Sequence, residues 1–155
     1  MQKIKKYKTL IIIVLSLYSA VILYLMFIGF DRITFTDNMY NFIPFKVIYS
    51  FCADFIESLS NHPELAKDEL WTFTINILGN IGVFIPFGIL LTLLYDGSLK
   101  KSFIVFIIGI IIVEILQLIS HRGVCDVDDI MLNFVGFIVG YKIISLIRVE
   151  YVRTA

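Results

Sequence analysis

The sequence predicts an all-α membrane protein: a four-transmembrane-helix bundle with an additional extracytoplasmic amphipathic helix. Hydrophobic residues make up 59% of the 155-residue chain, whereas soluble domains are about 45–50% apolar. Four windows are long and apolar enough to cross a bilayer, which takes about 20 residues per helix. Basic residues are concentrated on one side of these windows. The predicted spans, within a single membrane domain covering residues 1–155, are residues 9–30, 71–95, 102–120 and 130–147.

The first span is predicted to be an uncleaved membrane anchor. It is too long for the apolar region of a signal peptide, and no small-residue cleavage site precedes Asp31. Four spans place both chain ends on one side of the membrane. Nine of the 13 Lys and Arg residues lie on that side and four on the other, which predicts that both termini are cytoplasmic. Because 13 basic residues balance 13 acidic ones, the net charge gives no reason to expect a nucleic-acid partner.

Residues 31–70 form the predicted extracytoplasmic segment, and part of it has the pattern of an amphipathic helix. Such a helix lies on the membrane surface or packs over the bundle. The alternative is a solvated helix with a small core of its own. Just before it, Pro44 predicts a break at membrane level, because residues before proline disfavour helix. The predicted apolar face comprises Phe45, Ile48, Cys52, Phe55 and Leu59, and the opposite face comprises Lys46, Ser50, Asp54 and Glu57.

Polar side chains recur in the extracytoplasmic halves of the second, third and fourth spans. Residues four positions apart share one helix face, so Asn76 and Asn80 point the same way. For Asn76 we favour a hydrogen bond between helices. A carboxylate at membrane depth needs a partner, and His121 and Arg122 are the nearest candidates for Glu114. We predict a polar cleft open to the cell exterior, whose candidate ligand-binding residues are Asn80, Glu114, Gln117, Arg122, Asp126, Asp129 and Asn133.

Glycines and prolines suggest structural roles. Gly136 and Gly140, four residues apart, predict a surface where helices pack closely. Pro86 predicts a kink in the second span, which either opens space for a ligand or is a tolerated bend. The two cysteines could pair in an oxidising compartment, but we favour free thiols. The residues given structural roles are Pro44, Pro86, Gly88, Gly136 and Gly140.

Four sequence elements occur in a specific order between residues 41 and 140. They are Asn41-Phe-Ile-Pro44-Phe45, then Asn80 with Phe84-Ile-Pro86-Phe87-Gly88, then Glu114-Ile-Leu-Gln117, then Arg122 followed by Asp126, Asp128, Asp129, Asn133 and Gly136. With this ordered set the chain resembles the VanZ-like family of small bacterial membrane proteins. The resemblance implies a place in the bacterial cell membrane and a role in the cell envelope. It also implies lowered susceptibility to teicoplanin, a lipoglycopeptide antibiotic.

Three kinds of function are compatible with these residues. We favour a non-catalytic protein that binds an envelope lipid or a lipid-anchored lipoglycopeptide, with Arg122 meeting an anionic headgroup. The second is a membrane enzyme acting on a lipid phosphate or acyl group, in which Asp126, Asp128 and Asp129 hold a divalent cation. The third is a transporter or an accessory subunit of a membrane assembly, with oligomer formation as a further option. We expect no cofactor and no resident metal, since the sequence has no P-loop or HExxH motif.

Overall fold

A computed structural model describes residues 2–29 and 40–154, with side chains for residues 7–29 and 40–148. Residues 31–39 of the predicted extracytoplasmic segment therefore lie outside the described residues, as do the side chains of Lys3, Lys5, Lys6 and Arg153. The elements in chain order are α1 (Gln2–Phe27), β1 (Tyr40–Asn41), α2 (Lys46–Asn61), α3 (Pro63–Leu94), α4 (Leu99–Ser120), β2 (Cys125–Asp126) and α5 (Val127–Thr154).

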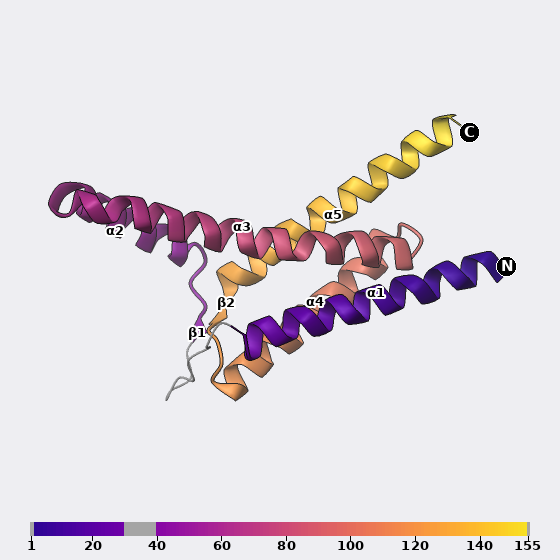
Figure 1. Ribbon diagram of the computed structural model, residues 1–155, viewed down its shortest axis with the longest axis horizontal. Coiled ribbons are helices and arrows are strands. Elements are labelled where there is room, and N and C mark those ends of the chain that lie inside the picture. Colours follow the sequence, from indigo (N-terminus) through magenta and orange to yellow (C-terminus); the bar gives the residue numbers. More distant parts are fainter. Residues whose placement is uncertain (1, 30–39, 155) are drawn as a thin grey trace.

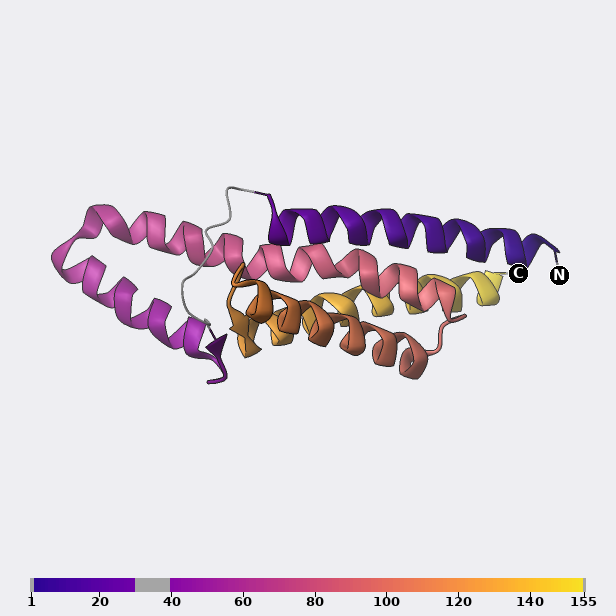
Figure 2. The ribbon, with the colours of Figure 1, turned by 90° about the horizontal axis from the view of Figure 1, so that it is seen from below.

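Helices α1, α3, α4 and α5 are each long and apolar enough to span a membrane. This confirms the predicted fold class, and we treat the chain as a multi-pass membrane protein. Figure 1 shows the four helices running lengthwise, with α5 crossing α3 at an angle. Figure 2 shows α1 lying along α3, on the side away from α4 and α5. The start of α1 and the end of α5 lie at one end of the molecule, and α2 lies at the other.

The most extensive helix contact in the described structure joins α3 to α5, and glycines make it possible. A Cβ atom on Gly88 would lie 2.2 Å from the Phe137 carbonyl oxygen, and one on Gly136 would lie 2.2 Å from the Ile81 carbonyl oxygen. Gly140 meets the α3 backbone just as closely. Small residues allow membrane helices to approach until their backbones touch. The pair of glycines singled out in the sequence therefore lies directly against α3.

Aromatic side chains fill the centre of the bundle. The rings of Phe106 and Phe137 stack with centroids 4.6 Å apart, and Phe84 meets Phe106 edge-on at 5.9 Å. Inside a membrane this packing stabilises chiefly through dispersion, because lipid tails are as apolar as the side chains. The buried cluster consists of Phe84, Leu91, Phe106, Ile110 and Phe137.

Helix α3 is continuous from Pro63 to Leu94 with Pro86 inside it, so the proline does not end or divide the helix. Proline lacks the N–H that would bond the carbonyl one turn earlier. Close to that position, the Tyr18 hydroxyl of α1 donates to the Val83 carbonyl oxygen at 2.8 Å. The turn before Pro86 is thus a point where α1 is attached to α3.

Helix α2 and the first turns of α3 form an antiparallel hairpin, joined by His62 alone. Pro63 starts α3, a position where its missing N–H costs nothing. The Phe51 ring of α2 stacks on Phe73 of α3 with centroids 3.9 Å apart. Figures 1 and 2 show this hairpin extending beyond the ends of the other helices.

The face of α2 that contacts α3 is not the predicted apolar face. Ser58 is buried in the hairpin and donates its hydroxyl to Glu69. The helix begins on the α3 side with Val47 and Phe51, both partly buried. Packing therefore selects a stripe rotated from the one that hydropathy alone indicates. Of the predicted apolar face, Phe55 is partly buried, whereas Phe45, Ile48, Cys52 and Leu59 are exposed.

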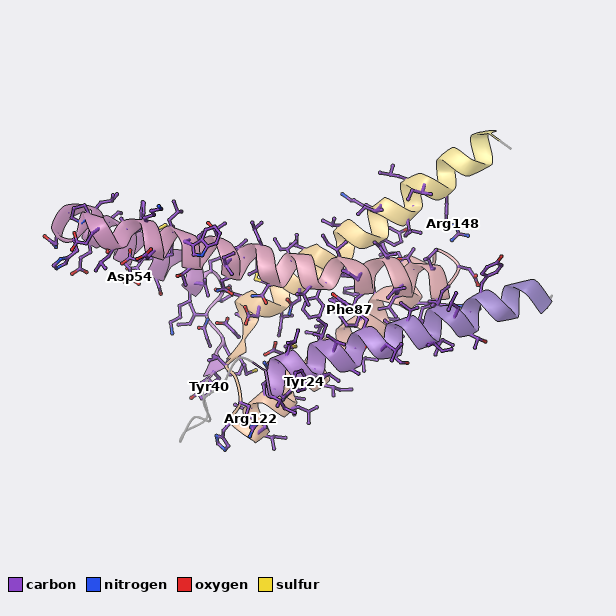
Figure 3. All side chains as sticks on the ribbon, viewed as in Figure 1. Tyr24, Tyr40, Asp54, Phe87, Arg122 and Arg148 are labelled. Atoms are coloured by element: carbon purple, nitrogen blue, oxygen red, sulfur yellow. The ribbon has the colours of Figure 1, made fainter. Side chains whose placement is uncertain are left out.

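A turn with charged neighbours connects α3 to α4 near the chain ends. Lys8 of α1 donates a hydrogen bond to the Asp96 carboxylate at 2.6 Å. This bond, with the charges of Arg148 and Lys101, lowers the pKa of Asp96. Figure 3 shows Arg148 beside the turn. The basic residues gathered here are among those that predict a cytoplasmic location for this end.

Candidate functional site

A polar cavity of about 330 Å³ lies between the four spanning helices. It is formed by the middle of α3, the last turns of α4 and the first turns of α5, in the part of the bundle far from the chain ends. Helix α1 closes one side with apolar side chains, among them Ile22 and Met26. Arg122 and Asp126 are not among the lining residues. The other candidate residues named from the sequence all line the cavity: Asn80, Glu114, Gln117, Asp129 and Asn133.

Asn133 is the most deeply buried polar residue of the cavity, with 2% of its surface exposed. Its Oδ1 atom is buried and has no hydrogen-bond partner among the described residues. A buried acceptor left unsatisfied costs about 1–3 kcal/mol, and buried polar groups are normally bonded. Asn133 therefore presents an acceptor for a donor that the described chain does not supply.

One turn before Asn133, Asp129 links α5 to α3. The Asn80 side chain donates to the Asp129 carboxylate at 2.7 Å and to Asn76 at 3.0 Å. Asn80 thus makes the bond between helices at the cavity wall, a kind of contact worth about 0.6–2 kcal/mol in membranes. Asn76, for which the sequence favoured that role, instead bonds within α3.

Glu114 has 5% of its surface exposed and faces the chain after α4. Its carboxylate accepts the Asp126 backbone N–H at 3.3 Å and lies near the thiol of Cys125. The prediction that His121 or Arg122 is the partner of Glu114 is wrong. His121 ends α4 in a left-handed conformation with φ 55°. The chain turns back there, so that strand β2 reaches Glu114 and the residues of the turn do not.

Cys125 lies outside the spanning helices, next to the Glu114 carboxylate. Burial, and then the negative charge of Glu114, raise the pKa of the Cys125 thiol. A thiol that keeps its proton is suited to donate to Glu114. Cys52 is exposed on α2, and both cysteines are free thiols, as predicted from the sequence.

Arg122 anchors the end of α1 and does not line the cavity. Its guanidinium donates to the Phe27 carbonyl oxygen at 2.9 Å, and Figure 3 shows it beside the last turns of α1, near Tyr24. The last carbonyls of a helix lack partners within the helix and favour cations. The side chain of Arg122 thus helps to position α1 and is not among the described side chains that line the cavity.

Asp126 joins the segment after the first span to the start of α5. Strands β1 and β2 pair in parallel, with Asn41 opposite Asp126. The Asn41 side chain donates to Asp126 Oδ1 at 2.9 Å, and the Asp128 N–H donates to the same oxygen at 2.8 Å. Asn41 is 6% exposed and was not among the predicted site residues. Its membership of the Asn41–Phe45 element was the one sequence signal that pointed to it.

Asp128 caps helix α2 from a distant part of the chain. Its two carboxylate oxygens accept the backbone N–H groups of Phe45 at 2.6 Å and Val47 at 2.9 Å. Phe45, at the N-cap position with φ 64°, supplies no side-chain cap. The carboxylate thus satisfies donors that begin α2, where a negative charge also favours the helix dipole. The sequence placed Asp128 at the start of its own helix and did not indicate this second role.

The three acids at the start of α5 diverge to three partners. Asp126 bonds Asn41, Asp128 caps α2, and Asp129 bonds Asn80. In the part of the chain that the structure describes, no three His, Cys, Asp or Glu side chains are placed to hold a metal ion. The hypothesis that these acids share a divalent cation therefore has no support in their arrangement.

Comparison with known proteins agrees with the motif order. A model of the VanZ/LLP1 family matches residues 11–148. The chain belongs to the VanZ/LLP1 family. It is also similar to "Protein VanZ" of Enterococcus faecium, with 35% identity over 72 residues. That alignment covers 45% of this chain and 44% of the relative, so the chain spans less than half the length of this curated protein. No solved structure matches.

In this VanZ/LLP1 chain, the four elements that carry the resemblance meet at one end of the bundle. Asn41 bonds the acidic element through Asp126, and Glu114 bonds the same residue through its backbone. Asn80 bonds Asp129. The elements therefore build both the wall of the cavity and the framework that holds that wall in place.

Proposed function

We propose that this VanZ/LLP1 protein binds an amphiphilic molecule of the bacterial cell envelope, a lipid or a lipid-anchored ligand, in the polar cavity. We propose further that this binding lowers susceptibility to lipoglycopeptide antibiotics such as teicoplanin. The observation that carries the proposal is the buried Oδ1 of Asn133, which has no hydrogen-bond partner among the described residues and belongs to a residue that lines the cavity. Family membership and the similarity to Protein VanZ support the envelope role.

The size and position of the cavity support binding in one leaflet. Small-molecule sites are commonly about 300–1,000 Å³ and combine apolar walls with a few placed polar groups. Here α1 supplies the apolar wall and α3, α4 and α5 supply the polar groups. The excess of basic residues near the chain ends supports a cytoplasmic location for those ends and, with it, a place for the cavity in the outer leaflet.

The arrangement of the acids favours binding over catalysis. Each carboxylate of Asp126, Asp128 and Asp129 already accepts a hydrogen bond from the chain. All three link separate secondary-structure elements, which gives them a structural role that requires no reaction. Glu114, Gln117 and Asn133 are the buried polar residues among those described that line the cavity.

The proposal is tested by filling the cavity. Gly79 lines the cavity and Gly82, one turn on, does not. A Cβ atom on either glycine meets nothing within 4 Å, so both accept a larger side chain. In a susceptible strain that expresses the protein, Gly79→Leu should abolish any protection against teicoplanin, and Gly82→Leu should preserve it. Equal protection by both variants, at equal membrane levels, would contradict the proposal.

Asn133→Leu provides a second test of the same cavity. It removes the unpartnered acceptor and replaces the amide with an apolar group of similar shape. With this substitution, protection against teicoplanin and surface binding of fluorescent teicoplanin should both fall below the values of the parent protein. If neither changes, Asn133 is a packing residue and the cavity is not the site of action.

A further inference from the structure

Positive side chains from three helices converge on the turn between α3 and α4. Lys8 of α1 donates to the Asp96 carboxylate at 2.6 Å. Arg148 of α5 lies against Gly97, because a Cβ atom on this glycine would overlap the guanidinium, and Figure 3 shows the arginine beside the turn. Lys101 of α4 is close enough for its charge to act on Asp96. Three cations therefore surround one carboxylate, and this group of four side chains keeps an excess of two positive charges.

The start of α4 adds to the positive charge at this turn. Its first turn reads Leu99-Lys-Lys-Ser102. The N-terminus of a helix is the positive end of its dipole, where acidic side chains are favoured and basic ones are not. Lys101 and Arg148 are both exposed. An anion from the surroundings can therefore reach these cations and would relieve the repulsion among them.

The cations lie at the level of the membrane where lipid headgroups lie. The spans that carry them are Tyr7–Phe27, Leu99–Ser120 and Val127–Arg148. Each cation is among the outermost three residues of its span, and long basic side chains at span ends extend toward the headgroups. Tyr7, beside Lys8, is exposed, as is typical of tyrosines in the interfacial belt.

We infer that the turn between α3 and α4 binds the phosphate of an anionic phospholipid, in the leaflet next to the chain ends. The planar guanidinium of Arg148 is suited to donate two hydrogen bonds to a phosphodiester, and Lys101 adds a second positive charge. A zwitterionic lipid brings its own cation and gains less from an excess of positive charge. This turn lies at the opposite end of the bundle from the polar cavity, so the inference does not depend on the proposed function.

The inference is tested with phosphatidylglycerol and phosphatidylcholine of the same acyl chains. Each lipid is titrated into the full-length protein in a mild non-ionic detergent, and bound lipids are counted by native mass spectrometry. Phosphatidylglycerol should bind at least about tenfold more tightly, and one basic residue near a membrane surface is worth about fivefold in affinity for an anionic lipid. Arg148→Gln and Lys101→Gln should each weaken phosphatidylglycerol binding by that factor. Equal binding of the two lipids to the parent protein would overturn the inference.

Lys142→Gln is the matched control. Lys142 is an exposed cation on the same helix as Arg148 and is not among the charges that act on Asp96. This variant should bind phosphatidylglycerol like the parent protein. If it weakens binding as much as Arg148→Gln does, the lipid is attracted by basic helix ends in general, and a site at the turn is contradicted.

Asp96→Asn tests the sign of the effect. It removes the carboxylate that competes with the phosphate and frees Lys8, so phosphatidylglycerol should bind about fivefold more tightly. Asparagine tolerates the left-handed φ of 55° at this position, and loss of folding does not strengthen binding. Unchanged or weaker binding would overturn the inference.

Inorganic phosphate identifies the source of the anion. It is added in excess over phosphatidylglycerol, at an ionic strength matched with sodium chloride. Lipid binding that persists supports a headgroup site. Displacement of the lipid by phosphate, and not by sodium chloride, would assign the turn to a free phosphate and overturn the lipid assignment.

Discussion

Replacement of Asp128 should release the start of α2 from α5. The carboxylate is 6% exposed and accepts two backbone N–H groups, at 2.6 and 2.9 Å. Hydrogen bonds to charged groups contribute about 1.5–3 kcal/mol each, and the loss of both bonds sets the upper limit of the free-energy cost of the substitution. Loss of an acidic N-cap costs about 0.5–2 kcal/mol. Because water can reach part of the freed backbone, we expect a local cost of about 2 kcal/mol for Asp128→Ala and about half of that for Asp128→Asn.

The assay for this prediction is amide hydrogen exchange at the first turn of α2. A local cost of about 2 kcal/mol corresponds to roughly 30-fold faster exchange at Phe45 and Val47. Asp54→Ala is the matched control, since Asp54 is an exposed acid on the same helix. Figure 3 shows Asp54 on the hairpin, away from the start of α5. Unchanged exchange at Val47 in Asp128→Ala would refute the capping role, as would an equal change in the control.

Three further predictions concern packing, acid–base chemistry and topology. Gly136→Leu should prevent close approach of α3 and α5, because even its Cβ would lie 2.2 Å from the Ile81 carbonyl oxygen. Size-exclusion profiles should show loss of the folded protein, whereas Gly82→Leu behaves like the parent. Cys125 should react with iodoacetamide at pH 8 more slowly than Cys52, since only the thiolate reacts and burial and Glu114 raise the pKa of Cys125. Glu114→Gln should lower that pKa and speed the reaction; a slower reaction contradicts the contact. Reporter fusions should place both chain ends in the cytoplasm, and activity of a periplasmic or extracellular reporter at either end would contradict the orientation.

The helices could be predicted from the sequence because hydropathy and length decide which segments cross a membrane. Their ends were less predictable. The second span was placed at residues 71–95, whereas α3 begins at Pro63, since its first turns pack against α2 and need no lipid. The face of α2 that contacts α3 was not predicted for a related reason. Phe51 stacks on Phe73, and a contact with a particular neighbour cannot be read from periodicity alone.

The lining of the cavity was predictable because helical spacing places polar residues of one span on one face. The partners of those residues were not. Asn41 and Asp126 lie 85 positions apart, and a two-residue strand pairing brings them together. Arg122 was assigned to a ligand because it is charged and lies at a membrane boundary. Its bond to the Phe27 carbonyl depends on where α1 ends beside the turn after α4, which is a property of the assembled bundle.

The most direct test of the central claim is native mass spectrometry of the purified protein released from mild detergent. If the polar cavity holds an amphiphile, the parent protein and Gly82→Leu should each carry one bound molecule, and Gly79→Leu should carry none. A Gly79→Leu protein that retains the same adduct as the parent would contradict the claim that this cavity is the binding site.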